Sequence, residues 1–125
     1  MTGTLDGLRV LVVEDEPLQA LNYYDILTDA GAEVLGPYAS SSSAIAVAAK
    51  LSCDVAVVDY ALDDETSVSL QERLETLDIP FIVLTAYPKV LVRRYTLQTV
   101  IAKPVSPELL CRMVKVSAKQ PARPH

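Results

Sequence analysis

Four apolar runs in this sequence each end in a polar side chain, and this pattern limits the fold more than any other feature. The runs and the residues after them are Leu8–Val13 with Glu14 and Asp15, Val55–Val58 with Asp59, Phe81–Leu84 with Thr85, and Val100–Ala102 with Lys103 and Pro104. Runs that are continuous rather than alternating are typical of strands buried on both faces. Because the carboxyl ends of parallel strands lie at one edge of an α/β sheet, we expect these polar groups to meet there.

Helical segments separate the apolar runs. A further short strand is expected at 33–36, and Gly31 is placed to end the helix before it. The four helices are expected to begin at Pro17, after the serines at 40–43, at a Thr66 cap and at Ser106. Strands that alternate with helices predict a parallel sheet with right-handed crossover connections.

The first helix carries an apolar stripe. We expect Ala20, Tyr24 and Leu27 to face the core, with Leu18 and Leu21 widening the stripe. This face would pack the helix against the sheet.

Composition and charge exclude several classes of protein. The 125 residues, half of them hydrophobic, suit one domain, with expected bounds of 1–7 for an N-terminal extension, 8–118 for the domain and 119–125 for a flexible tail. A net charge of −5 argues against direct nucleic-acid binding. No apolar run approaches the ~20 residues of a membrane span, and the N-terminus does not resemble a signal peptide. The cytoplasm is therefore the expected location.

The acids at the strand ends predict a metal site. Glu14, Asp15 and Asp59 would converge, and each close pair would repel by roughly 1–4 kcal/mol unless a cation neutralised it. An all-oxygen set suits Mg²⁺, which bridges carboxylates to phosphate oxygens. The backbone carbonyl of Ala61 is placed to complete the metal shell.

The other groups predict phosphoryl transfer onto Asp59. Its carboxylate would attack as a nucleophile and become an aspartyl phosphate. Lys103 would bring a positive charge to the phosphoryl group, and the Thr85 hydroxyl would bond a phosphoryl oxygen only once that oxygen is present. An aspartyl-phosphate phosphatase of the haloacid dehalogenase type needs a second acid two residues after the nucleophile, where this chain has Ala61.

Taken together, Glu14-Asp15, Asp59, Thr85-Ala86 and Lys103-Pro104 resemble the motif set of the receiver domain of two-component response regulators. The likeness covers about Leu8 to Ser117. It implies a (βα)5 flavodoxin-like three-layer sandwich with a parallel five-stranded sheet of order 2-1-3-4-5. It also implies Mg²⁺-dependent phosphorylation of Asp59 by a sensor histidine kinase or a phosphotransfer protein in a phosphorelay, with no enzymatic activity beyond the domain's own phosphorylation and dephosphorylation.

A subgroup resemblance concerns the connection after the fourth apolar run. The stretch Pro80–Tyr87 is similar to the PFxFATGY pattern of FAT GUY receivers, with Leu84 and Ala86 departing from it. Members of this subgroup tend to have a reduced fourth helix and are often stand-alone regulators beside kinases of the HWE type. Independently, the segment from Ala86 to Gln98 leaves little room for a full helix, so we expect a short or disordered fourth helix.

The output side of the domain differs from most receivers. Tyr or Phe usually stands three residues before the lysine, where this chain has Val100. We therefore expect Thr85 to act on the segment that begins at Ala86 and Tyr87 through a change in its order. The expected function is a stand-alone phosphoacceptor that switches contacts with an unknown partner. The alternative is a pseudo-receiver that binds protein without being phosphorylated, and homodimer formation is left open.

Overall fold

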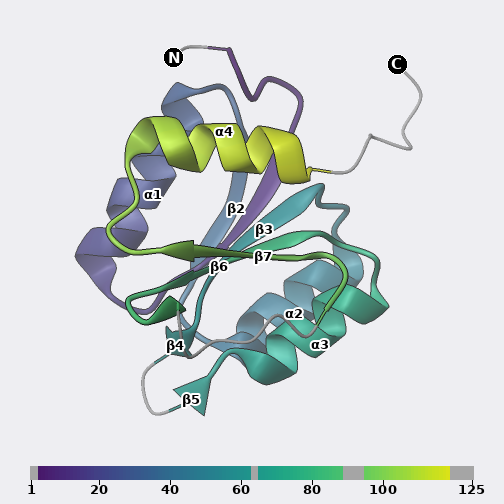
Figure 1. Cartoon of the computed structure of the whole chain (residues 1–125). Coiled ribbons are helices and arrows are strands. Elements are labelled where there is room, and N and C mark those ends of the chain that lie inside the picture. The colour runs from purple at the N-terminus through teal and green to yellow at the C-terminus, as the bar shows by residue number, and fades with distance from the viewer. Residues whose placement is uncertain (1–2, 63–64, 89–94, 119–125) are drawn as a thin grey trace.

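The computed structural model describes residues 3–62, 65–88 and 95–118 as one three-layer domain around a parallel sheet (Figure 1). The sheet has five strands in the order β2-β1-β3-β6-β7. Their bounds are β1 Arg9–Val13, β2 Glu33–Tyr38, β3 Val55–Asp59, β6 Phe81–Thr85 and β7 Gln98–Ala102. Counted within the sheet alone, this order is 2-1-3-4-5, so the predicted flavodoxin-like fold is confirmed.

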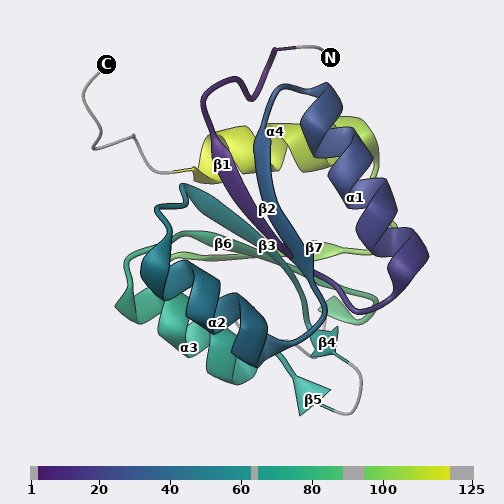
Figure 2. The same ribbon diagram turned by 180° about the vertical axis from the view of Figure 1, so that it is seen from behind.

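Two helices cover each face of the sheet. The four described helices are α1 Pro17–Asp29, α2 Ser41–Lys50, α3 Val68–Thr76 and α4 Pro107–Ser117. Figures 1 and 2 show α1 and α4 on one face, with α2 and α3 packed side by side on the other. This placement explains the continuous apolar runs, because every side chain of a central strand meets a helix layer.

Alternate residues of each strand divide between the two layers. In β1, Val10 and Val12 pack into the core beneath α1 and α4. Leu11 and Val13 pack into the core beneath α2 and α3. All five residues of β3 are buried, so its final residue, Asp59, is carried by a strand with no solvent-facing side.

A short hairpin follows β3. Its strands, β4 Ala61–Leu62 and β5 Glu65–Thr66, pair antiparallel, with Ala61 opposite Thr66. Thr66 was predicted to cap the next helix, and this was wrong. Ser67 occupies that position instead, without a side-chain capping bond, because Thr66 is held in the hairpin. The prediction of a short or disordered fourth helix covers the segment from Ala86 to Gln98, of which 89–94 lie outside the described residues. The predicted flexible tail at 119–125 also lies outside them.

The buried face of α1 differs from the sequence prediction. Tyr23 and Leu27 are its buried residues, whereas Tyr24 and Leu21 are exposed and Leu18 is 76% exposed. The helix carries apolar residues on two sides, and contact with β1 and α4 selects the side that includes Tyr23. The expected core positions of Tyr24, Leu21 and Leu18 were therefore wrong.

The N-terminal residues pack onto the domain. Leu5 is fully buried in the core, and its N–H donates to the carbonyl of Ala30 at 2.8 Å. Gly31 adopts a φ of +100°, and a Cβ there would lie 1.9 Å from an oxygen of Asp6. The packed unit thus begins before Leu8, where the sequence placed the start of the domain.

Candidate functional site

The register of the parallel strands gathers the predicted polar groups at one edge of the sheet. Val13 pairs with Val58, so Glu14 follows β1 where Asp59 ends β3. Asp59 pairs with Leu84, so Thr85 lies one residue further along the neighbouring strand. Thr85 in turn pairs with Ala102, the residue before Lys103. The pairing of consecutive strands therefore positions all four groups.

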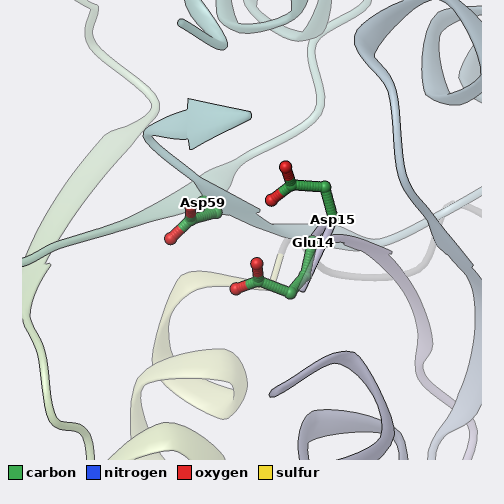
Figure 3. Close-up of side chains that lie close together, drawn as sticks. All are labelled: Glu14, Asp15 and Asp59. Atoms are coloured by element: carbon green, nitrogen blue, oxygen red, sulfur yellow. The ribbon is translucent and has the colours of Figure 1, made fainter. Parts of the chain in front are cut away.

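Three acids form the centre of the site. One oxygen from each of Glu14, Asp15 and Asp59 lies within 4.8 Å of the others, and Figure 3 shows their carboxylates converging from two neighbouring strands. Glu14 and Asp59 are buried, while Asp15 is partly exposed. Three carboxylates at this separation repel one another in the absence of a cation.

The donor set fits a hard divalent cation. Glu14 Oε2 accepts a hydrogen bond of 3.0 Å from the N–H of Glu16, but Glu14 Oε1 is buried with no hydrogen-bond partner. A buried carboxylate oxygen that accepts no hydrogen bond is costly, and a metal ion could coordinate it. Oxygen ligands from carboxylates are those that Mg²⁺ takes in proteins.

Lys103 supplies positive charge beside the acids. Its ammonium forms an ion pair with Asp59 Oδ1 and lies 3.6 Å from Glu14 Oε1. The backbone N–H of Lys103 donates to the carbonyl of Thr85 at 2.8 Å, which fixes the start of its side chain at the sheet edge. The lysine therefore neutralises part of the acidic cluster and leaves Asp15 without an ion pair among the described residues.

Burial sets the proton affinity of the two inner acids. Desolvation raises the pKa of Glu14, and repulsion from Asp59 and Asp15 adds to this effect, while the N–H of Glu16 and Lys103 oppose it. Desolvation also raises the pKa of Asp59, which Lys103 opposes by its hydrogen bond and charge. Both shifts mean that ionising these two acids costs more free energy here than it does in water.

Thr85 and the residues after it lie beside this cluster. Thr85 is buried, and its Oγ1 accepts a hydrogen bond of 3.1 Å from the N–H of Tyr87. The hydroxyl proton is thus available for a different acceptor. Ala86 is exposed and Tyr87 is 73% exposed, while Val100 is partly buried in β7. Ala61, two residues after Asp59, lies in β4 with an exposed side chain.

The sequence prediction missed Tyr23. It is buried on α1, and its hydroxyl donates to Gln19 Oε1 at 3.0 Å. Burial raises the pKa of Tyr23, and the charges of Glu14 and Asp59 raise it further, so its hydroxyl lies in the field of the acidic site. The spacing of Tyr23, Leu27 and Ala30 at i, i+4 and i+7 would have identified this face of the helix.

An apolar groove adjoins the acids. Its volume is about 470 Å³, and its walls include Asp15, Leu21, Tyr24, Pro37 and Ala39. Leu21 and Tyr24, which were expected in the core, thus line a surface next to the site.

A comparison with protein families identifies this domain. Residues 10–115 match the family described as response regulator receiver domain. The chain belongs to this family, whose members are signalling modules of two-component systems. Receiver domains interact with histidine kinases or phosphotransfer proteins and generally bind Mg²⁺ at an acidic cluster, which corresponds here to Glu14, Asp15 and Asp59.

Solved structures of receivers resemble this chain. The response regulator PhyR from Brucella abortus is 26% identical, with a TM-score of 0.78, over 89% of this chain and 47% of that chain. The receiver domain of PhyR from Erythrobacter litoralis is 24% identical, with a TM-score of 0.79, over 97% of this chain and 99% of that chain. The receiver domain of the hybrid histidine kinase CckA is 23% identical, with a TM-score of 0.75, over 89% and 99%.

This chain is shorter than some of the proteins that it resembles. The chain spans about half the length of the Brucella PhyR chain that it resembles. No curated protein sequence matches it. Within the described residues, no helix has the length and apolar character needed to cross a lipid bilayer.

Proposed function

We propose that this receiver is a phosphoacceptor and that Asp59 becomes phosphorylated. The observation that carries the proposal is the ion pair between Lys103 and Asp59 inside a cluster that also holds Glu14 and Asp15. A binding module would have no need to bury a carboxylate among other acids. Desolvation raises the pKa of Asp59, and carboxyl groups with perturbed pKa values cluster at functional sites.

The chemistry follows from the groups at the sheet edge. A carboxylate oxygen of Asp59 attacks phosphorus, the bond from phosphorus to the donor's imidazole nitrogen breaks, and the donor histidine keeps that electron pair. Mg²⁺ would be held by Glu14, Asp15, Asp59 and the Ala61 carbonyl, and it would supply charge neutralisation for the phosphoryl oxygens.

Lys103 and Thr85 act on the product. The ammonium of Lys103, now paired with Asp59, contacts a phosphoryl oxygen in its place through a charge-assisted hydrogen bond. Thr85 donates its hydroxyl proton to another phosphoryl oxygen, because its own oxygen already accepts from Tyr87. Thr85, Ala86 and Tyr87 thereby connect the modified aspartate to the output segment. Because Val100 stands where most receivers have an aromatic ring, the segment that begins at Ala86 and Tyr87 is the part that responds to phosphorylation.

The phosphoryl donor is a sensor histidine kinase or a phosphotransfer protein acting in the cytoplasm. Support comes from the exposed Leu18, Leu21 and Tyr24 on α1 and from the apolar groove next to Asp15. Apolar side chains gathered beside a reactive group are typical of a surface that receives another protein. Assignment to the FAT GUY subgroup rests on the stretch Pro80–Tyr87. Stand-alone action remains a prediction from the sequence, and homodimer formation is left open.

Treatment with a small phosphodonor tests this proposal. Acetyl phosphate with Mg²⁺ should add one phosphoryl group to the protein, detected by intact mass, and EDTA should prevent the addition. Asp59→Asn should remain unmodified, while Asp25→Asn, an exposed change on α1, should behave as wild type. A wild-type protein that gains no mass under these conditions would instead be a pseudo-receiver.

A further inference from the structure

Three polar side chains are buried on the α3 side of the sheet, away from the acidic cluster. Ser67, Gln71 and Gln98 are 0%, 1% and 3% exposed. Glutamine is rarely buried, because its amide must find partners for both its oxygen and its nitrogen. The three residues come from the start of α3, its first turns and the first position of β7.

These side chains form one continuous chain of hydrogen bonds. Gln98 Nε2 donates to Gln71 Oε1 at 2.9 Å, and Gln71 Nε2 donates to Ser67 Oγ at 3.1 Å. Each glutamine therefore donates from its amide nitrogen to the next side chain, and both hydrogen bonds run in the same direction, from Gln98 towards Ser67. Replacing any member leaves a buried polar group of its neighbour without that partner.

Both ends of this chain reach backbone that matters for the receiver. At one end, the N–H of Ser67 donates to the carbonyl of Tyr60, the residue after Asp59, at 2.8 Å. At the other end, Gln98 Oε1 accepts from the N–H of Tyr95 at 3.4 Å. The chain thus connects the turn after Asp59 to the turn before β7.

The next turn of α3 reinforces the second connection. Glu75 accepts from the N–H of Leu97 at 3.1 Å and from the hydroxyl of Thr96 at 2.5 Å. Ser67, Gln71 and Glu75 are spaced by four residues, so they lie along one side of α3 and follow each other towards β7. Residues at the start of α3 and on its side therefore contact both the turn after Asp59, through Ser67, and the 95–98 turn, through Glu75.

We propose that the buried chain Ser67–Gln71–Gln98 couples the turn after Asp59 to residues 95–98, with Gln71 and Gln98 acting as positioning residues. The surrounding core is apolar, including Leu70, Leu74 and Phe81, and apolar contacts have no preferred direction. Hydrogen bonds between buried amides have a fixed length and direction, so a shift of Ser67 moves Gln71 and then Gln98. As a route for the phosphorylation signal, this inference rests on the proposed function.

Amide hydrogen exchange in a mutant cycle tests the coupling in the unphosphorylated protein without Mg²⁺. Ser67→Ala removes the acceptor at the Asp59 end. In the wild-type background we expect the Tyr95 and Leu97 amides to exchange about tenfold faster, beyond any change at Val12, which reports opening of the central sheet. In the double variant Gln71→Met with Gln98→Met, Ser67→Ala should change these two amides no more than it changes Val12.

Matched variants separate coupling from general loss of stability. Leu70→Ala weakens the same helix packing without touching the chain, and Glu72→Met places methionine on an exposed position of α3. Neither should accelerate Tyr95 and Leu97 more than Val12. If the double methionine variant does not fold cooperatively, Ser67→Ala is measured in the Gln98→Met background instead. Gln98→Met cuts the link between Gln71 and Gln98 and leaves the hydrogen bond between Ser67 and Gln71 intact.

The proposal is overturned if Ser67→Ala affects Tyr95, Leu97 and Val12 equally in the wild-type background. It is also overturned if the response of Tyr95 and Leu97 persists when the glutamines are replaced. Because no phosphoryl group is used, either result leaves the mass measurement at Asp59 unaffected. A missing mass gain, conversely, refutes the phosphoacceptor function and not the coupling.

Discussion

Replacing Asp15 with asparagine should stabilise the metal-free protein and destabilise the Mg²⁺-bound protein relative to wild type. Asp15→Asn keeps the shape of the side chain and removes one of the three converging charges. Lys103 pairs with Asp59 and Glu14, so the substitution breaks no ion pair of the described residues. When metal is absent, the substitution removes the repulsion of Asp15 from Glu14 and Asp59.

The structure sets the size of this effect. At the 4.8 Å limit between ligand atoms, each carboxylate pair repels by about 0.9 kcal/mol at a dielectric of 80 and about 3.5 kcal/mol at 20. Asp15 is partly exposed, so solvent screens it and the lower figure applies to its two pairs. Asp15→Asn should therefore raise the free energy of unfolding by about 1–2 kcal/mol in EDTA, or Tm by roughly 4 °C per kcal/mol.

Mg²⁺ should make wild type more stable than the Asp15→Asn variant, which reverses their order in EDTA. Wild type gains about 2.7 kcal/mol at a Mg²⁺ concentration one hundred times its Kd, whereas the variant has lost a ligand and gains much less. Urea unfolding followed by circular dichroism, in EDTA and across a Mg²⁺ titration, measures both quantities. Asp25→Asn is the control, since this exposed residue on α1 lies outside the cluster.

Two results would refute the reasoning. If Asp15→Asn is less stable than wild type in EDTA, the three acids do not repel in the way that their distances imply. If the variant and wild type gain equally from Mg²⁺, Asp15 is not a ligand of the metal.

Three other predictions follow from the same geometry. Lys103→Met should lower the free energy of unfolding in EDTA by about 1–3 kcal/mol, because it leaves Glu14 and Asp59 without their ion pair to Lys103. Mg²⁺ should then stabilise the variant by more than it stabilises wild type. Urea unfolding measures both effects. Burial raises the pKa of Glu14 and of Asp59, so between the ordinary and the raised pKa values the folded protein binds more protons than the unfolded chain. The stability of metal-free wild type, relative to the double variant Glu14→Gln with Asp59→Asn, should therefore fall as pH rises through that window. Thermal melts measure this slope, and a slope of opposite sign would contradict the shifts. Gly31→Ala should lower the free energy of unfolding by about 1–3 kcal/mol, since φ is +100° and the new Cβ would meet the Asp6 carboxylate. Urea unfolding measures this loss, with Ala49→Gly at an exposed helical position for comparison.

The acidic site could be predicted from the sequence because its positions depend on strand ends alone. Asp59, Thr85 and Lys103 each end an apolar run, and parallel pairing brings such ends to one edge whatever the details of the helices. Glu14 and Asp15 follow the first run in the same way. Strand order and the three-layer arrangement also followed, once those residues were compared with receivers.

Features that depend on how a helix is rotated could not be predicted in the same way. Tyr23 and Tyr24 are adjacent and both apolar enough for a core, and only packing of α1 against the sheet and α4 decides that Tyr23 is buried. Thr66 and Ser67 are both residue types that cap helices, and hairpin pairing of Thr66 leaves the cap position to Ser67.

The sequence by itself determined the parallel sheet and the polar residues gathered at its edge, because a local pattern of apolar runs and terminal polar residues suffices for both. Only the tertiary structure decided that Leu5 joins the core, that α1 exposes one of its two apolar sides, and that Gln71 meets Gln98. The physical reason is that these contacts join residues far apart in the chain, whose pairing is set by the balance of burial and hydrogen bonding over the whole domain.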